Sequence, residues 1–152
     1  MDRINVGVIG TGWCGGIRAE ACAANPLVDE LHVAEINEDR LKEITAKTGA
    51  VGSTTDWEKI AANPNIKTVM ISATPETTHY PMAKACLEAG KDVFLEKPIA
   101  ITLAEADELV ALSRKNNVKF TIGYSQRFNP KYAYIKKSLE DGTLGEPISA
   151  LV

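Results

Sequence analysis

Short apolar runs alternate with stretches of helical periodicity along most of the chain. The runs are rich in Val and Ile, and the stretches between them repeat apolar residues every three or four positions. Strands that alternate with helices of about 10–15 residues are typical of βαβ units, which form a parallel sheet with right-handed crossovers. The pattern predicts strands at Ile4–Ile9, Leu31–Glu35, Lys67–Ser72, Asp92–Leu95 and Val118–Gly123, a weaker strand at Ala50–Gly52, and helices at Cys14–Ala24, Glu38–Thr48, Thr55–Ala62, Thr77–Ala89 and Leu103–Lys115.

Residues that begin and end helices agree with these bounds. Gly49 and Gly90 each follow a predicted helix, where a left-handed cap favours glycine. Thr102 and Glu105 have the spacing of a capping box in front of the last of these helices. The chain therefore predicts an α/β fold, a doubly wound parallel sheet with helices on both faces.

The pattern changes after Gly123. We expect a helix from about Lys131 to Asp141 with Gly142 as its cap, and then the start of an apolar strand at Ile148–Val152. A strand that starts at the end of the sequence has no partner within it and leaves an unprotected edge. The expected organisation is a dinucleotide-binding domain over residues 1–123, followed over 124–152 by a connecting helix and the first strand of a truncated α+β domain.

Composition excludes several classes of function. The 152 residues carry a net charge of −3, are 45% hydrophobic and show no basic stripe, so neither nucleic acid nor a membrane surface is an expected partner. No apolar run approaches the roughly 20 residues of a membrane helix. The three cysteines, Cys14, Cys22 and Cys86, have no metal-binding spacing, and the start of the chain lacks a signal-peptide pattern. We therefore expect reduced thiols, a cytoplasmic location and no metal site.

A glycine-rich turn follows the first strand. In Gly10-x-Gly12-x-x-Gly15, the first glycine allows a tight turn, the second lets a pyrophosphate approach the backbone, and the third lets helix and strand pack closely. The helix that starts there would present free N–H groups to the phosphates. Thr11, Trp13 and Cys14 lie within this turn, and Trp13 is either a cofactor contact or a partly exposed residue at the helix start.

An acidic residue, Glu35, ends the second predicted strand, at the distance expected for a carboxylate that binds the adenosine ribose. Its charge would repel a 2′-phosphate. Ile36 and Asn37 stand where an NADP site would favour arginine, so we expect NAD rather than NADP. Arg40 is the residue that argues for NADP.

A second tripeptide, Glu96-Lys97-Pro98, follows the apolar strand that ends at Leu95. Ligands of open α/β sheets bind outside the carboxyl ends of the strands, so this tripeptide would share one edge of the sheet with the glycine-rich turn. A lysine beside a nicotinamide cofactor indicates hydride chemistry in which Lys97 handles the proton. The alternative is an exposed surface pair of Lys97 with Glu96.

With these motifs, three further segments make the chain closely resemble the Gfo/Idh/MocA oxidoreductases, the group of glucose–fructose oxidoreductase and inositol dehydrogenase. The segments are Ile71–His79, Gly123-Tyr124-x-x-Arg127-Phe128 and Gly142–Pro147, and the resemblance covers the whole chain. It implies a Rossmann-type domain followed by a second domain, which would supply the substrate pocket and the interface of a homo-oligomer.

The resemblance also implies roles for individual residues. The turn would hold the pyrophosphate and Glu35 the adenosine ribose, while Glu96 would contact the nicotinamide-side ribose and Lys97 would be the catalytic lysine. Thr74, Pro75 and His79 would line the cofactor cleft, and Arg127, or Gln126 beside it, would lie near the nicotinamide amide. Simpler alternatives remain: His79 satisfies local backbone groups, or Arg127 pairs with a surface carboxylate. We also expect a cis Lys97–Pro98 bond.

The implied reaction is oxidation of a secondary alcohol of a sugar or cyclitol by NAD. Without the second domain, we expect this chain to bind NAD with little or no turnover. Three other functions stay open: a regulatory protein that senses NAD(P), an interaction domain with an empty cleft, and redox-neutral chemistry that uses NAD transiently.

Overall fold

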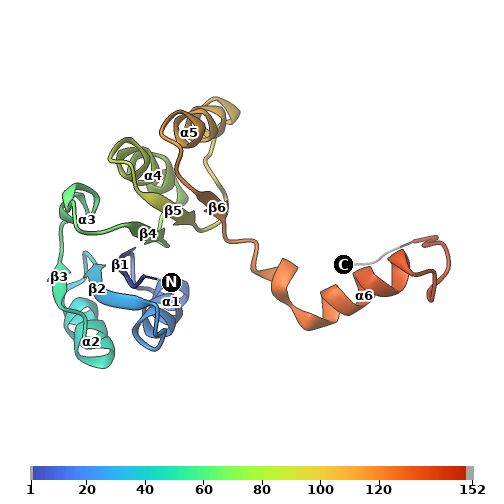
Figure 1. The fold of residues 1–152 in the computed structure, drawn as a ribbon, viewed down its shortest axis with the longest axis horizontal. Helices are drawn as coiled ribbons and strands as arrows, with labels where there is room; N and C mark the ends of the chain where they lie inside the picture. The colour runs from blue at the N-terminus through green and yellow to red at the C-terminus, as the bar shows by residue number, and fades with distance from the viewer. Residues whose placement is uncertain (1, 150–152) are drawn as a thin grey trace.

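The computed structural model describes residues 2–149 and forms one sheet of parallel strands. The strand order is β3-β2-β1-β4-β5-β6, so the direction of winding reverses between β1 and β4 (Figure 1). Ligands of doubly wound sheets bind at this switch point. The predicted fold class is confirmed. The strands are β1 Ile4–Ile9, β2 Val28–Ala34, β3 Gly52–Thr54, β4 Thr68–Ile71, β5 Asp92–Leu95 and β6 Phe120–Ile122.

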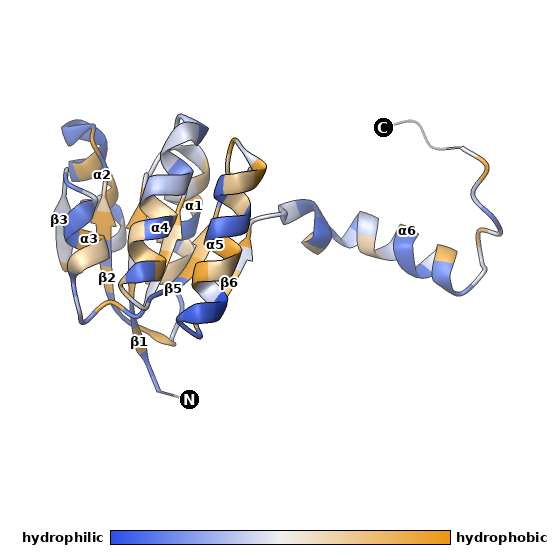
Figure 2. Cartoon of the chain, turned by 90° about the horizontal axis from the view of Figure 1, so that it is seen from above, coloured by the Kyte–Doolittle hydropathy of each residue, from blue (hydrophilic) through white to orange (hydrophobic). Residues whose placement is uncertain are grey.

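Helices cover both faces of the sheet. One face carries α1 and α2, and the other carries α3, α4 and α5 (Figure 1). Seen from above, α6 extends away from these layers (Figure 2). The helices are α1 Trp13–Ala23, α2 Glu38–Thr48, α3 Glu58–Ala62, α4 His79–Glu88, α5 Leu103–Lys115 and α6 Pro130–Glu140, with short 3-10 turns η1 Glu76–Thr78 and η2 Ser125–Phe128. No helix within residues 2–149 is long and apolar enough to cross a membrane.

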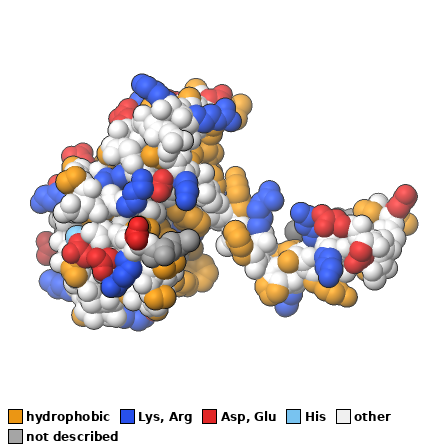
Figure 3. Space-filling view, in the orientation of Figure 1, with side chains coloured by type: hydrophobic (Ala, Val, Ile, Leu, Met, Phe, Trp, Pro, Cys, Tyr) orange, Lys and Arg blue, Asp and Glu red, His pale blue; other side chains and the backbone are white. Residues whose placement is uncertain are grey.

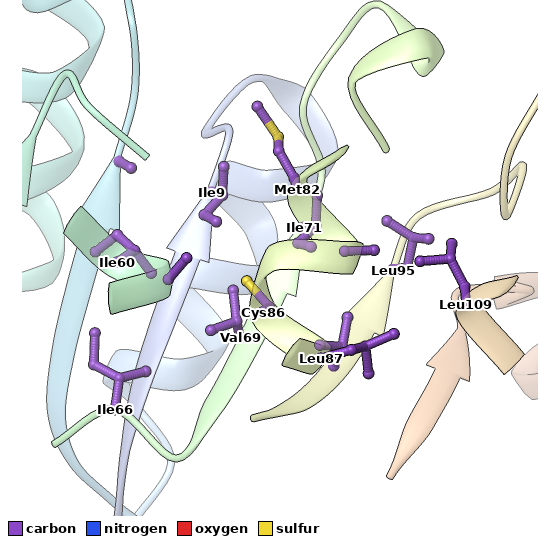
Figure 4. Close-up of a cluster of buried hydrophobic side chains, with 14 residues drawn as sticks. Ile9, Ile60, Ile66, Val69, Ile71, Met82, Cys86, Leu87, Leu95 and Leu109 are labelled. Atoms are coloured by element: carbon purple, nitrogen blue, oxygen red, sulfur yellow. The ribbon is translucent and has the colours of Figure 1, made fainter. Parts of the chain in front are cut away.

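Each face of the sheet has its own hydrophobic cluster. The larger lies under α3, α4 and α5 and includes Ile71, Leu87 and Leu95 (Figure 4). The smaller lies under α1 and α2 and includes Val33 and Ile44. Because both faces of the central strands are covered, these strands read as continuous apolar runs, which explains why the sequence pattern located them.

Several predicted bounds are confirmed, and two strands shift because of how they pair. The bounds of β1, β5, α2 and α5 match the prediction. β2 starts three residues earlier than expected because Val28 pairs with Ile4 across a register shift in β1. β3 lies at Gly52–Thr54 instead of Ala50–Gly52 because these later residues pair with the end of β2.

Two predicted helices are shorter than expected. The stretch from Thr55 begins its helix at Glu58, and the stretch from Thr77 starts as the 3-10 turn η1 before α4 begins at His79. The helix-end signals hold: Gly49 is left-handed with a φ of 68°, and Thr102 forms a capping box with Glu105.

The chain beyond β6 packs differently from the sheet. In α6, Ser138 is the buried residue, while Tyr132, Ile135 and Leu139 are exposed. The expected strand at Ile148–Val152 falls mainly outside the described residues, and its first two positions carry no strand. The division into domains at residue 123 stays a prediction.

Candidate functional site

A cavity of about 620 Å³ opens at the carboxyl ends of β1, β2, β4 and β5. These strands flank the switch point, so the loops that follow them meet there. The structure brings most of the predicted site residues into the wall of this cavity. Those in the wall are Gly10, Gly12, Trp13, Cys14, Glu35, Ile36, Thr74, Pro75, His79, Glu96 and Lys97.

The glycine-rich turn has the geometry that a phosphate site needs. Gly10 has a φ of 78°, a backbone conformation that residues other than glycine rarely adopt. A Cβ on Gly15 would clash with the carbonyl oxygen of Gly10, whereas a Cβ on Gly12 would meet no atom of the described residues within 4 Å. Within the described part of the chain, no side chain caps the first turn of α1. The turn therefore leaves open space in front of a helix N-terminus, which favours an anion.

Glu35 is tied to this turn by neutral hydrogen-bond donors. Its Oε2 accepts from the backbone N of Thr11 at 2.7 Å and from the Thr11 hydroxyl at 3.0 Å. Its Oε1 accepts from the backbone N of Asn37 at 3.1 Å. Thr11 itself is fully buried and does not line the cavity, so it meets the site through its hydrogen bonds to Glu35.

Arg40, the residue that argued for NADP, is engaged elsewhere. Its Nε donates to the carbonyl oxygen of Thr11 at 2.7 Å, and its guanidinium pairs with Glu43 at 2.7 Å. That guanidinium holds the pKa of the Glu43 carboxyl below its usual range. Since Arg40 does not line the cavity, it supports the turn from behind.

Glu96 does not form the surface pair with Lys97 that was the simpler alternative. Its carboxylate accepts from Arg18, which also donates to the Ser72 hydroxyl. The side chains of Arg18 and Glu96 are only 17% and 15% exposed. Sequence reasoning missed Arg18. The available signal was a charged residue within the buried stripe of α1, where Gly15, Ala19 and Cys22 lie.

Lys97 is exposed and lies where two cavities meet. The second, of about 690 Å³, is also lined by Tyr124, Gln126, Arg127 and Lys136. Gln126 and Arg127 thus line the second cavity and not the first, and Lys97 lines both; their expected contact with the nicotinamide amide stays a prediction. The Lys97–Pro98 bond is cis as expected, and Thr74–Pro75 is cis as well.

His79 is 1% exposed and links two loops at the cavity. Its Nδ1 lies 2.7 Å from the carbonyl oxygen of Pro98, and its Nε2 lies 3.0 Å from that of Ala73. A neutral imidazole donates through one nitrogen only, so both contacts are hydrogen bonds only when both nitrogens carry a proton. His79 thus lines the cavity and also contacts two backbone carbonyl groups. The sequence had offered these two positions as alternatives, and the structure has both.

Large apolar side chains frame the opening. Trp13 is 83% exposed and Ile36 is 79% exposed, although both line the cavity. Trp57, which the sequence did not single out, lines it too, so both tryptophans of the chain are at this site. Their position makes tryptophan fluorescence a direct probe of what enters the cavity.

The remaining chemistry of the described chain is sparse. Cys22 and Cys86 are buried as expected, and burial raises the pKa of both thiols, that of Cys86 to about 12. Among residues 2–149, no group of His, Cys, Asp and Glu could hold a metal ion. On the face that Figure 3 shows, acidic and basic side chains are interspersed over the sheet and helices.

A family model described as an oxidoreductase family with an NAD-binding Rossmann fold matches residues 4–124. The chain is 31% identical over 147 residues to myo-inositol 2-dehydrogenase of Thermotoga maritima, covering 95% of this chain and 43% of that protein. It is 34% identical over 157 aligned positions to levoglucosan dehydrogenase of Pseudarthrobacter phenanthrenivorans, covering 98% and 40%. The chain thus spans about two fifths of the length of these relatives.

The fold also matches solved structures. The scyllo-inositol dehydrogenase of Lactobacillus casei, solved with NAD(H) and scyllo-inositol, superposes with a TM-score of 0.87 at 25% identity. The match covers 95% of this chain and 43% of that one.

Proposed function

Because the chain belongs to the Gfo/Idh/MocA family of oxidoreductases, which bind NAD through a Rossmann fold, we propose that residues 1–123 are the cofactor domain of a dehydrogenase that acts on a secondary alcohol of a sugar or cyclitol. Its relatives include dehydrogenases of inositol and levoglucosan. Since the chain spans 43% and 40% of them, the substrate, the oligomer and the turnover of a whole protein belong to this proposal.

The residues of the cavity fit a dinucleotide. Gly12 leaves room for a pyrophosphate at the uncapped start of α1. Glu35, held by Thr11, offers a charged acceptor to the hydroxyls of the adenosine ribose. At the other side of the cavity, Glu96 and Lys97 would lie near the nicotinamide half. The two halves of the site are far apart in sequence, but they lie at one edge of the sheet because β1, β4 and β5 are neighbouring parallel strands.

The fixed carboxylate of Glu35 is the observation that carries the preference for NAD. A 2′-phosphate would bring negative charge to a carboxylate whose three donors are all neutral. Arg40 cannot offset that repulsion where it stands, because it is bonded to Thr11 and Glu43 behind the turn. Repulsion between the 2′-phosphate and the Glu35 carboxylate would therefore disfavour the binding of NADP.

When bound, NAD would supply the hydride acceptor, and the protein would supply position and proton handling. Lys97 lies between the two cavities, where its Nζ would reach a hydroxyl group of a substrate in the second cavity. An uncharged Lys97 amine would take the hydroxyl proton as the alcohol is oxidised. His79 would fix the segment that carries Lys97, because its ring contacts the carbonyl oxygen of Pro98.

A fluorescence titration of this chain tests the proposal. Trp13 and Trp57 both line the cavity, so a ligand there should quench their emission. We expect saturable quenching by NAD and at least about tenfold weaker binding of NADP, which corresponds to about 1.4 kcal/mol. Titration of a free tryptophan analogue corrects for light absorption by the nucleotide. Absence of saturable quenching by NAD, or tighter binding of NADP, would contradict the proposal.

A further inference from the structure

We propose that Arg18 is a positioning residue for Glu96, which it holds so that one carboxylate oxygen stays available to the nicotinamide-side ribose. This inference rests on the proposed function, since it assigns a task to a residue outside the cavity wall. Arg18 does not line the cavity, whereas both of its partners, Ser72 and Glu96, do. Arg18 would therefore position a ligand through those two side chains.

Arg18 connects three elements that are distant in sequence. It projects from α1, and its guanidinium donates to Ser72 after β4 and to Glu96 after β5, which lie 54 and 78 residues away. Arginine suits this task because its planar group presents several donors in fixed directions and can serve two acceptors at once. A lysine would place a single ammonium group there and could not reproduce both directions equally well.

The guanidinium lies in a narrow slot. Its central carbon is 4.7 Å from the centre of the Phe94 ring, within the range of a cation–π interaction. Gly123 lies close to both groups, because a Cβ added to it would lie 2.8 Å from a terminal nitrogen of Arg18 and 3.1 Å from the Phe94 ring. The missing side chain of Gly123 therefore makes the space in which Arg18 reaches Glu96.

In this arrangement only one of the two carboxylate oxygens of Glu96 has a partner among the described residues. Arg18 occupies Oε2, and among the described residues Oε1 makes no hydrogen bond. A carboxylate in a largely buried position would otherwise rotate to satisfy whichever donor it finds. Glu96 lines the cavity, so with Oε2 fixed we expect Oε1 to accept from a hydroxyl donor there, and a charged acceptor gives a stronger hydrogen bond than a neutral one.

Two ligands separate this role from a general structural one. ADP carries the adenosine and pyrophosphate groups that would bind Glu35 and the turn, and it lacks the nicotinamide ribose. We expect Arg18→Met to weaken NAD binding about tenfold while ADP binding changes less than about twofold. Arg18→Lys should recover part of the NAD affinity. Equal losses for NAD and ADP, or unchanged NAD binding, would overturn the proposal.

Two further variants keep the proposal testable if Arg18→Met fails to fold. Gly123→Ala leaves Arg18 in the sequence but pushes its guanidinium, so it should repeat the selective loss of NAD affinity. The double variant Arg18→Met with Glu96→Gln removes the unpaired charge, and its NAD affinity should be no lower than that of Glu96→Gln alone. Additive losses would contradict action through Glu96. If the wild-type chain binds NAD and Arg18→Met leaves that affinity unchanged, only this inference fails; if the wild-type chain does not bind NAD, the proposed function fails as well.

Discussion

Two glutamates mark the two sides of the cavity, and the protein holds them in different ways. Glu35 accepts three hydrogen bonds from neutral groups, two from Thr11 and one from Asn37. Glu96 is paired with the cation of Arg18. Among the described residues, the carboxylate of Glu35 therefore has no ion-pair partner, while that of Glu96 is part of an ion pair with limited exposure to solvent.

This difference indicates that the two sides of the cavity have different tasks in binding the cofactor. An uncompensated carboxylate can both accept from ribose hydroxyls and repel a 2′-phosphate, so it suits selection between NAD and NADP. A compensated carboxylate accepts without excluding negative charge, so it suits positioning. The expected effects of substitutions on the two sides should differ in the same way.

The largest effect should come from the turn that holds the Glu35 side. Gly15→Ala places a Cβ against the carbonyl oxygen of Gly10, so the backbone must shift. We expect a loss of about 3 kcal/mol in the free energy of unfolding, or roughly 6–12 °C in melting temperature. Gly12→Ala is the matched control, since its Cβ meets open space. It should keep its melting temperature and still lose at least about tenfold in NAD affinity; equal melting temperatures for the two variants would contradict this.

Substitution of Glu35 should affect both affinity and selectivity. Glu35→Ala removes the charged acceptor, and we expect about thirtyfold weaker NAD binding, or about 2 kcal/mol, with the preference over NADP largely lost. Glu88→Gln, at the far end of α4, is the control for a loss of charge. Titrations with both nucleotides check this, and a retained preference for NAD in Glu35→Ala would show that another group selects the cofactor.

A pH effect should arise in the core, independently of either glutamate. The folded protein keeps the proton on Cys86 up to its raised pKa of about 12, while the unfolded chain loses it near 9.0. The folded state then binds more protons, so the free energy of unfolding falls as pH rises through this window, by up to about 1.4 kcal/mol per pH unit.

Urea unfolding at pH 8 and 10.5 measures that effect. The loss of stability between these pH values should be about 2 kcal/mol smaller in Cys86→Ala than in the wild type. Burial lowers the pKa of Lys91, which acts in the opposite direction and largely cancels in this comparison. Cys14→Ala should follow the wild type. An identical loss in Cys86→Ala and wild type would assign the pH dependence to other groups.

The smallest effect is expected at Arg40. Arg40→Met removes a hydrogen bond to Thr11 behind the turn, so NAD and NADP should both bind about two- to threefold more weakly. Their ratio should not change. A selective fall in NADP affinity would mean that Arg40 turns toward a 2′-phosphate when that ligand binds.

The sequence predicted the side of the site that depends on local signals. The turn and Glu35 are neighbours of single strands, and the order of strands follows from βαβ logic. The pairing of Arg18 with Glu96 spans 78 residues and depends on the slot beside Gly123, which no local pattern encodes. Arg127 was expected at the cofactor, but its position depends on how the segment after β6 leaves the sheet.

The most direct test of the account is a crystal structure of this chain with NAD. We predict the pyrophosphate at the N-terminus of α1 in front of Gly12, the adenosine ribose bonded to Glu35, and the nicotinamide ribose within hydrogen-bond distance of Glu96 while Arg18 keeps its pair. A nucleotide bound elsewhere, or bound in this cavity without contact to either glutamate, would contradict the account.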